Sequence, residues 1–239
     1  MARTETIEPE IVHRDSDLLV VHKPPGLPTT APTAGEPSLV RWVSERFPEL
    51  RAHATSRLDS QVSGLVTFAL NREANQHLLD ARKSGTYERV YLGITLHELA
   101  DDAGQWDWPI SIDPRDPKHR RAGSGPGERH AITRYEVAAR RPGATLLRLM
   151  PRTGRTHQLR VHAAEAGAPL FGDPAYGGER RAVLPDGVVI TARRVMLHCV
   201  RVSFPPLSGS ERIVIEAPVR PDMQRIWQAF AGVSSELQA

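Results

Sequence analysis

The sequence predicts an α+β fold, in which a mixed and largely antiparallel central sheet is flanked by helices and loops. Predicted strands outnumber predicted helices about two to one, and the two kinds of element do not alternate regularly along the chain. This order argues against a doubly wound α/β fold. Hydrophobic residues make up 40% and charged residues 25% of the 239 residues, which is typical of a globular chain with a substantial buried core.

The strands are predicted from short apolar runs that are bounded by turn residues. The first run, 18–22, is followed by Pro24, Pro25 and Gly26, which predict a turn. The second run, 65–70, is continuously apolar and predicts a buried strand. The other predicted strands are 87–94, 131–138, 145–150, 188–191, 196–204 and 213–217.

Four helices are predicted, each from a polar N-cap that precedes apolar residues at helical spacing. The expected N-caps are Ser38, Asn71, Thr156 and Asp222. The second helix should stop before Gly85 and the third at Gly167, because glycine commonly follows a helix C-terminus. The apolar stripes of the first, second and fourth helices are Leu39, Trp42, Val43 and Phe47; Ala74, Leu78 and Ala81; and Met223, Ile226, Trp227 and Phe230.

The basic residues are almost all arginine. The net charge is only +3, but 28 of the 31 basic residues are arginine and three are lysine. A guanidinium binds phosphate with two parallel hydrogen bonds and stacks on bases, so this bias suits a nucleic-acid partner. A GC-rich genome raises arginine in the same way, so the total does not decide between these explanations.

Several classes of protein are disfavoured by composition. Thirteen aromatic residues give little support to a base-stacking platform. Cys199 has no second cysteine with which to form a disulfide, and no apolar stretch is long enough to span a bilayer. The first residues also lack the apolar core of a signal peptide. We therefore expect a cytoplasmic protein without membrane contact.

A basic segment covers residues 113–134. Its composition of arginine, glycine, serine and proline predicts a long mobile loop, and loops of this length are often functional. We expect the loop to contact RNA phosphates, with Arg120 and Arg121 as the test positions, and a solvated insertion is the alternative. Its basic side chains are Arg115, Lys118, His119, Arg120, Arg121, Arg129 and Arg134.

Two segments and one tyrosine are candidates for chemistry. Residues 56–64 read SRLDSQVSG, and an extended chain would place Arg57 and Asp59 on the same side. By itself this pattern also fits a turn with a surface ion pair. Tyr91 lies in a predicted strand, where core packing is the simpler explanation.

The second segment, TGRTHQLRVH at 153–162, is followed by GDPAYG at 172–177. An arginine near the start of a helix is unfavourable to the helix dipole, so Arg160 should have an acidic partner elsewhere. An amphipathic helix with a solvated basic side is the alternative. We expect no metal site, because His157 and His162 are five residues apart and no third ligand is near.

Together these segments resemble the RluA-type pseudouridine synthase family. Residues 56–64 are similar to its H-R-L-D-x-x-T-S-G segment, and residues 153–177 to its T-G-R-T-H-Q-I-R-V-H through G-D-x-x-Y-G run. The resemblance extends from about residue 11 to 218. It includes VHKPPGL at 21–27, which matches N-K-P-x-G-L, and the Leu197-His198 and Phe204-Pro205 pairs near the end.

The resemblance implies a pseudouridine synthase-like fold and an RNA pseudouridine synthase, an isomerase that acts on uridines of rRNA or tRNA without a cofactor. It implies that Asp59 is the nucleophile and that Arg160 is its ion-pair partner. It also implies that Tyr91 stacks on the target uracil and that Arg57 fills the gap left by the flipped base. We expect further RNA contacts from Arg155, His157 and Gln158.

Three positions depart from the family pattern. Ser56 stands for histidine, Val62 for threonine and Arg89 for lysine. The first two flank Asp59 without replacing it, so they bear on substrate fit and loop geometry more than on the chemical step. Arg89 keeps the positive charge.

The expected organisation is one catalytic domain, 11–230, made of two packed halves, with tails at 1–10 and 231–239. Too few residues precede 11 for the S4-like RNA-binding domain that many relatives carry, so we expect the short form with the catalytic domain only. We also expect a monomer. Two other functions are considered. One is a non-catalytic RNA-binding protein that retains the fold. The other is a nucleoside or glycoside hydrolase, which would need a partner acid that the motifs lack.

Overall fold

The computed structural model describes residues 8–31, 33 and 35–239. The chain divides into two compact units. The first contains the chain up to Tyr87 together with Val202–Ala217, and the second contains Glu88–Arg201 and Pro218–Ala239. Most of the expected N-terminal tail, residues 1–7, lies outside the described residues.

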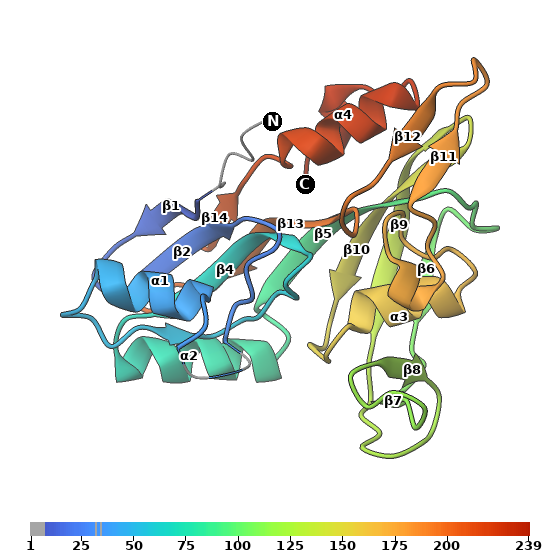
Figure 1. Ribbon diagram of the computed structural model, residues 1–239. Coiled ribbons are helices and arrows are strands. Elements are labelled where there is room, and N and C mark those ends of the chain that lie inside the picture. Colours follow the sequence, from blue (N-terminus) through green and yellow to red (C-terminus); the bar gives the residue numbers. More distant parts are fainter. Residues whose placement is uncertain (1–7, 32, 34) are drawn as a thin grey trace. The chain divides into compact units, whose positions relative to one another are not determined.

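The first unit is built on an antiparallel arrangement of strands (Figure 1). β2 (Leu18–Lys23) pairs with β1 (Glu10–Arg14) on one side and with β4 (Ser63–Ala69) on the other. All residues of β2 and β4 are buried, as the apolar runs predicted. The short strands β3 (His53–Ala54) and β14 (Ile213–Glu216) complete this unit.

Two helices of the first unit confirm their predicted caps. α1 (Leu39–Arg46) begins after Ser38, whose side chain accepts a hydrogen bond from the Arg41 N–H. α2 (Arg72–Lys83) begins after Asn71, whose side chain accepts one from the Ala74 N–H. α2 packs against β4 through a buried face. The buried helix residues are Leu39, Val43, Ala74, Leu78 and Ala81.

The second unit carries four antiparallel strands in the order β5-β10-β9-β6. Their bounds are Glu88–Thr95, Ala103–Trp106, Thr133–Arg141 and Ala144–Pro151 for β5, β6, β9 and β10. β13 (Leu197–Phe204) begins in this unit and ends in the first. With four α-helices in the described ranges and antiparallel strand pairs in both units, the α+β class is confirmed.

The other two α-helices belong to the second unit, and both predicted caps are wrong. α3 (Gln158–Glu165) begins after His157, whose φ of 59° takes it out of the helical region, so Thr156 is no cap. α4 (Pro221–Ala229) begins after Arg220. Pro221 suits the first helical position because it has no N–H to satisfy, which moves Asp222 into the first turn.

The core of the second unit joins α4 to β5, β10 and β13. It contains fully buried Leu92, Leu146 and Trp227. The chain after α4, expected to be a tail, forms the short 3-10 helix η2 (Ser234–Leu237), whose Leu237 is buried in the same core.

The segment 113–134, predicted as one long loop from its composition, contains a short strand. β8 (Arg120–Ala122) pairs with β7 (Ile110–Ile112) in an antiparallel hairpin. Arg129 then returns to Ile110 with two backbone hydrogen bonds of 2.8 and 2.9 Å. Polar composition concealed this hairpin because it is anchored by few apolar residues, chiefly Ile110, which packs with Val161 of α3.

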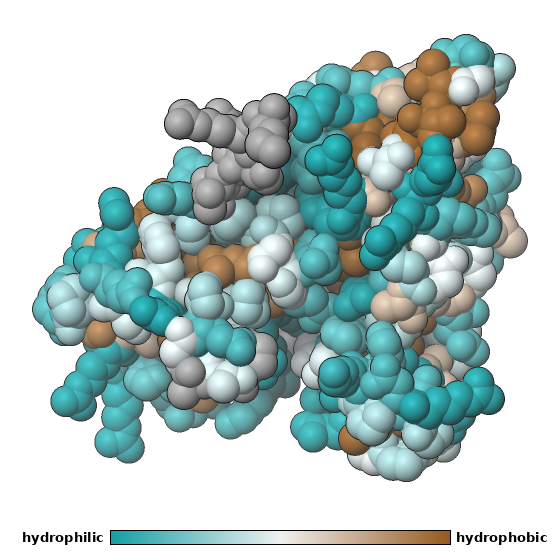
Figure 2. All heavy atoms as spheres, in the orientation of Figure 1, coloured by the Kyte–Doolittle hydropathy of each residue, from teal (hydrophilic) through white to brown (hydrophobic). Residues whose placement is uncertain are grey.

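A second hairpin, β11 (Arg181–Val183) and β12 (Val189–Thr191), ends in an exposed apolar tip. Val183, Val188 and Val189 are all exposed there, and Figure 2 shows apolar atoms gathered over this hairpin. Among the described residues, no helix combines the length and apolar character needed to cross a bilayer.

Candidate active site and RNA interface

Asp59 lies in a tight turn that leads into β4. The Val62 N–H donates to the Asp59 carbonyl at 3.0 Å, which closes the turn directly before the fully buried strand. Leu58 is buried, whereas Asp59 is half-buried and Arg57 is exposed. The segment therefore alternates as an extended chain does, and it anchors the carboxylate through its neighbours on both sides.

Thr29 fixes the backbone next to Asp59. Its buried hydroxyl donates to the Leu58 carbonyl and accepts from the Leu58 N–H, both at 2.9 Å. One side chain thus satisfies both backbone groups of the residue that precedes the carboxylate. Thr29 is a site residue that sequence reasoning missed, because its partner lies 29 positions along the chain.

The short motif at 21–27 packs against the same turn. Ser60 exchanges two hydrogen bonds with Gly26, one from the Gly26 N–H at 2.8 Å and one from the Ser60 hydroxyl at 3.0 Å. Gly26 has a φ of +87°, a conformation that favours glycine. The Lys23 ammonium is fully buried and donates to the carbonyls of Pro24 and Leu27. The two short motifs therefore form one structural element around Asp59.

Two departures from the family pattern face the interior. Ser56 is buried, and its hydroxyl accepts a hydrogen bond from the Thr67 N–H of β4 at 3.2 Å. Val62 is 2% exposed. Both residues therefore support the turn that carries Asp59.

Tyr91 and Arg89 lie on β5 of the second unit. Tyr91 is buried and pairs in register with Leu149 of β10. The Arg89 guanidinium, also buried, donates to the Thr153 carbonyl at 2.8 Å. The third departure from the family pattern thus holds the loop that precedes α3.

Arg160 forms a buried ion pair with Asp173. Its Nε and Nη2 atoms each donate to one carboxylate oxygen, both at 2.7 Å, and the Asp173 side chain is 1% exposed. Asp173 is therefore an acidic partner of the kind that we expected from the position of Arg160 near the start of a helix. Two of the five guanidinium N–H groups bind Asp173, and the geometry fixes the direction of the other three.

Gly172 allows Asp173 to take this position. A Cβ atom on Gly172 would lie 1.9 Å from the Arg194 carbonyl oxygen, and the φ of Gly172 is +83°. The glycine before the aspartate is therefore required by close backbone approach.

Tyr176 connects the ion pair to the neighbouring loop. The Arg160 guanidinium lies 4.7 Å from the centre of the Tyr176 ring. The Tyr176 hydroxyl lies 2.6 Å from His157 Nδ1 and accepts a hydrogen bond from the Arg120 N–H at 3.1 Å. Asp173 and Tyr176 stand in the GDPAYG segment, but the sequence assigned no role to either, because their partners are set only by folding.

Gln158 is buried, and its amide is fully engaged within the second unit. Its oxygen accepts from the Thr153 hydroxyl at 2.8 Å and from the Arg155 N–H at 3.0 Å. Its nitrogen donates to the Ile132 carbonyl and the Thr133 hydroxyl. This side chain, expected to contact RNA, therefore holds the loop 153–155 against the start of β9.

Arg155 and His157 are half-buried on the same loop. Arg155 Nε donates to the His130 carbonyl at 2.8 Å. Burial lowers the pKa of Arg155, and so does the positive charge of the nearby Arg129. Two guanidinium groups therefore lie in the same region. Such a region attracts phosphate.

His162 is buried and serves the fold. Its Nε2 donates to the Trp108 carbonyl at 2.9 Å, so Nδ1 of the neutral ring accepts from the Thr133 hydroxyl at 3.0 Å. Burial lowers the pKa of His162 below its ordinary value. No group of three or more metal-ligating side chains gathers among the described residues.

Arg120 and Arg121, the arginines of the basic segment that we expected to contact RNA, lie on β8. Arg120 Nη1 donates to the Pro117 and His119 carbonyls at 2.9 and 2.7 Å. Arg121 is exposed, and its Nη2 donates to the Ser124 carbonyl at 2.6 Å. The hairpin thus presents these side chains from a fixed backbone.

Comparison with known proteins identifies the family. The model of the RNA pseudouridylate synthase family matches residues 17–165. The chain belongs to this family of isomerases. It is 35% identical over 96% of its length to the "Ribosomal large subunit pseudouridine synthase D" of Xanthomonas campestris, of which it covers 71%. It is 30% identical over 93% of its length to the "Uncharacterized RNA pseudouridine synthase YhcT" of Bacillus subtilis, of which it covers 72%.

The chain spans 63% of the length of another pseudouridine synthase D, from Neisseria meningitidis, with 32% identity over 95% of this chain. Two solved structures of the family share the fold. "Human RNA Pseudouridylate Synthase Domain Containing 4" gives a TM-score of 0.72 at 20% identity over 92% of both chains. "Human RNA Pseudouridylate Synthase Domain Containing 1" gives 0.70 at 23% identity over 98% of both. The pseudouridine synthase-like fold is confirmed.

Proposed function

We propose that this protein converts specific uridines of ribosomal RNA to pseudouridine, with Asp59 as the nucleophile. Relatives named for the large ribosomal subunit favour rRNA over tRNA as the substrate. A substrate of this kind implies action in the cytoplasm, and we propose that the protein acts as a monomer. The observation that carries the catalytic assignment is the turn that fixes Asp59 from both sides.

The reaction needs no redox partner. The bond between N1 of uracil and C1′ of ribose breaks, the base turns, and C5 bonds to C1′. C5 loses a proton and N1 gains one, so atoms and electrons balance within the nucleotide. A carboxylate can stabilise or trap the cationic sugar carbon that the first step creates, as in glycoside hydrolysis.

Asp59 suits this role through its anchoring. The turn bond from Val62, the Thr29 hydroxyl on Leu58 and the Gly26 bonds to Ser60 fix the backbone around the carboxylate. A fixed backbone limits the positions that the carboxylate can take, and good orientation of reacting groups is a large part of catalysis.

Arg160 and Tyr91 are the proposed catalytic partners of Asp59. Asp173 binds one edge of the Arg160 guanidinium with two hydrogen bonds and thereby fixes the orientation of this cation. An adjacent cation stabilises the ionised form of a carboxylate, which is the form that a nucleophile needs. Tyr91 is proposed to stack on the target uracil and to assist removal of the C5 proton.

The RNA contacts are proposed at basic side chains of the same segments. Arg57 is exposed and, among the described residues, makes no hydrogen bond or ion pair, which suits a side chain that enters a base stack. Arg155, His157, Arg120 and Arg121 are proposed to contact phosphates. Gln158 is proposed to act by positioning their loop.

The test uses ribosomal RNA from cells that lack the protein, labelled with tritium at C5 of uridine. Wild-type protein should release tritium and leave no free uracil, whereas D59N should release none. D101N, which changes an exposed aspartate, is the matched control and should remain active. Tritium release by D59N contradicts the catalytic assignment. Free uracil would indicate a hydrolase, and binding without release by the wild type would indicate a binding protein.

A further inference from the structure

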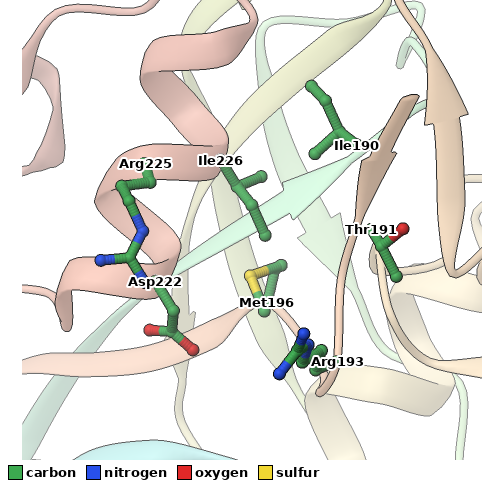
Figure 3. A pocket seen from close by; sticks show the side chains of 7 residues that line it. All are labelled: Ile190, Thr191, Arg193, Met196, Asp222, Arg225 and Ile226. Carbon is green, nitrogen blue, oxygen red and sulfur yellow. The ribbon is translucent and has the colours of Figure 1, made fainter. Parts of the chain in front are cut away.

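A pocket of about 430 Å³ lies between β12 and α4 of the second unit. Figure 3 shows the side chains that line the pocket. Ile190 and Thr191 belong to β12, Met196 directly precedes β13, and Ile226 belongs to α4. A pocket of this size falls within the range of small-ligand sites. None of its lining residues has a part in the proposed catalytic site.

The pocket combines an apolar lining with positive charge. Ile190, Met196 and Ile226 supply the apolar surface. Arg193 and Arg225 line the pocket and are exposed, and among the described residues neither forms a hydrogen bond or a close ion pair. This pairing suits a ligand with a flat apolar part and an anionic part.

The acidic side chain of the pocket does not oppose an anion. Asp222 accepts hydrogen bonds from Arg194 Nε at 2.6 Å and Nη2 at 2.9 Å, and from the Met223 N–H at 2.8 Å. Burial disfavours its ionisation, but these hydrogen bonds and the charges of Arg194 and Arg225 hold the pKa of Asp222 below its ordinary value. Its charge is therefore compensated, and Arg193 and Arg225 leave the pocket with positive charge.

More arginines continue the positive surface along the hairpin. Arg181 pairs in register with Thr191, and the Arg180 carbonyl accepts from the Ala192 N–H at 2.9 Å. Both arginine side chains are exposed. Arg180 and Arg181 therefore add exposed positive charge on the strand that pairs with β12, and positive charge of this kind attracts phosphate.

We propose that this pocket binds an unpaired nucleotide of the RNA substrate, outside the one that is isomerised. The base would lie against Met196 and Ile226, and Arg193 and Arg225 would contact the flanking phosphates. The inference rests on the proposed function for the identity of the RNA. It adds a contact that would help to choose the uridine, because a second fixed nucleotide sets the register of the strand.

The backbone connects this pocket to the ion pair of Arg160. The Met196 N–H donates to the Phe171 carbonyl at 2.8 Å, two residues before Asp173. The Arg194 carbonyl closely approaches Gly172, directly before Asp173. Both sites therefore share one rigid part of the second unit, so a nucleotide in the pocket would hold the strand in a fixed relation to Arg160.

The first test measures RNA affinity against salt. R193Q/R225Q should lower the slope of log K against log salt by about 1.4, because each single-strand phosphate contact contributes about 0.7. The matched control is R51Q/R72Q, which removes two exposed arginines of the first unit and the same charge. Its slope should stay at the wild-type value. Equal slopes for the two double variants would overturn the proposal.

The second test locates the RNA directly. Ribosomal RNA fragments that carry 4-thiouridine should crosslink to peptides containing Met196 or Ile226, in the wild type and in D59N alike. Adducts confined to other peptides would contradict the proposal that this pocket binds the RNA. Pocket adducts without pseudouridine formation in any ribosomal RNA would overturn the proposed function alone. Normal turnover with neither adduct nor slope change would overturn this inference alone.

Discussion

Asp173 holds the Arg160 guanidinium with both of its carboxylate oxygens, each at 2.7 Å from a donor nitrogen. The aspartate is almost fully buried, and Tyr176 packs on the face of the same guanidinium. An arginine on a helix is thereby given one fixed orientation by residues that follow the helix in sequence.

Asp173→Asn should destabilise the protein and impair it as an enzyme. Removing one member of a buried ion pair leaves an uncompensated charge and costs about 3–5 kcal/mol of unfolding free energy. Turnover should fall about 100-fold, since small displacements of a catalytic group have effects of this size. Chemical denaturation measures the free energy of unfolding, and tritium release measures the turnover. Asp102→Asn, which breaks an exposed pair with Arg140, is the control and should change neither greatly.

Tyr176→Phe should separate the hydroxyl from the ring. The variant keeps the ring under Arg160 but loses the hydroxyl contacts to His157 and Arg120. We expect a loss of about 1–2 kcal/mol in stability and a higher KM for RNA with a smaller change in kcat. Tyr135→Phe is the control, because the Tyr135 hydroxyl makes no hydrogen bond among the described residues. An unchanged KM for Tyr176→Phe would refute the positioning role.

Thr29→Val should affect Asp59 without touching it. The substitution removes both hydrogen bonds to Leu58, which costs about 2 kcal/mol and loosens the turn that carries the carboxylate. We expect kcat to fall and KM to change less. Thr29→Ser retains the hydroxyl and should restore kcat. If both variants turn over alike, Thr29 does not position the nucleophile.

The buried His162 predicts acid sensitivity of the fold. Because burial lowers its pKa in the native protein, the unfolded chain binds a proton more readily, with a pKa near the ordinary 6.5. Stability should therefore fall as the pH drops below about 6.5. Thermal unfolding between pH 7.5 and 5 should show a smaller loss for His162→Gln than for the wild type. An identical pH dependence would exclude His162 as a source of the acid sensitivity.

Charge reversal at Arg120 and Arg121 tests the β7–β8 hairpin as an RNA contact. The double Arg→Glu variant should reduce the salt dependence of RNA binding, because two phosphate contacts are lost. The matched control reverses Arg51 and Arg72. An unchanged slope for the hairpin variant would favour a hairpin that is merely solvated.

The sequence predicted elements whose residues lie close together in the chain. Ser38 and Asn71 cap their helices as expected, since a cap bonds to N–H groups three residues away. The caps at Thr156 and Asp222 were wrong because the backbone of His157 and the ring of Pro221 decide where those helices begin. The strand within the basic segment was missed because its partner strand begins at Ile110, outside the segment.

The sequence by itself determined the family, since the motifs around Asp59 and Arg160 stand in the order and spacing that the family shares. It also indicated that Arg160 needs an acid. Only the tertiary structure chose Asp173 as that acid, Thr29 as the support of Leu58, and the arginines beside the β12–α4 pocket. The physical reason is that these contacts join residues that are distant in the chain. Such residues come within reach of hydrogen bonds and charges only when the chain has folded.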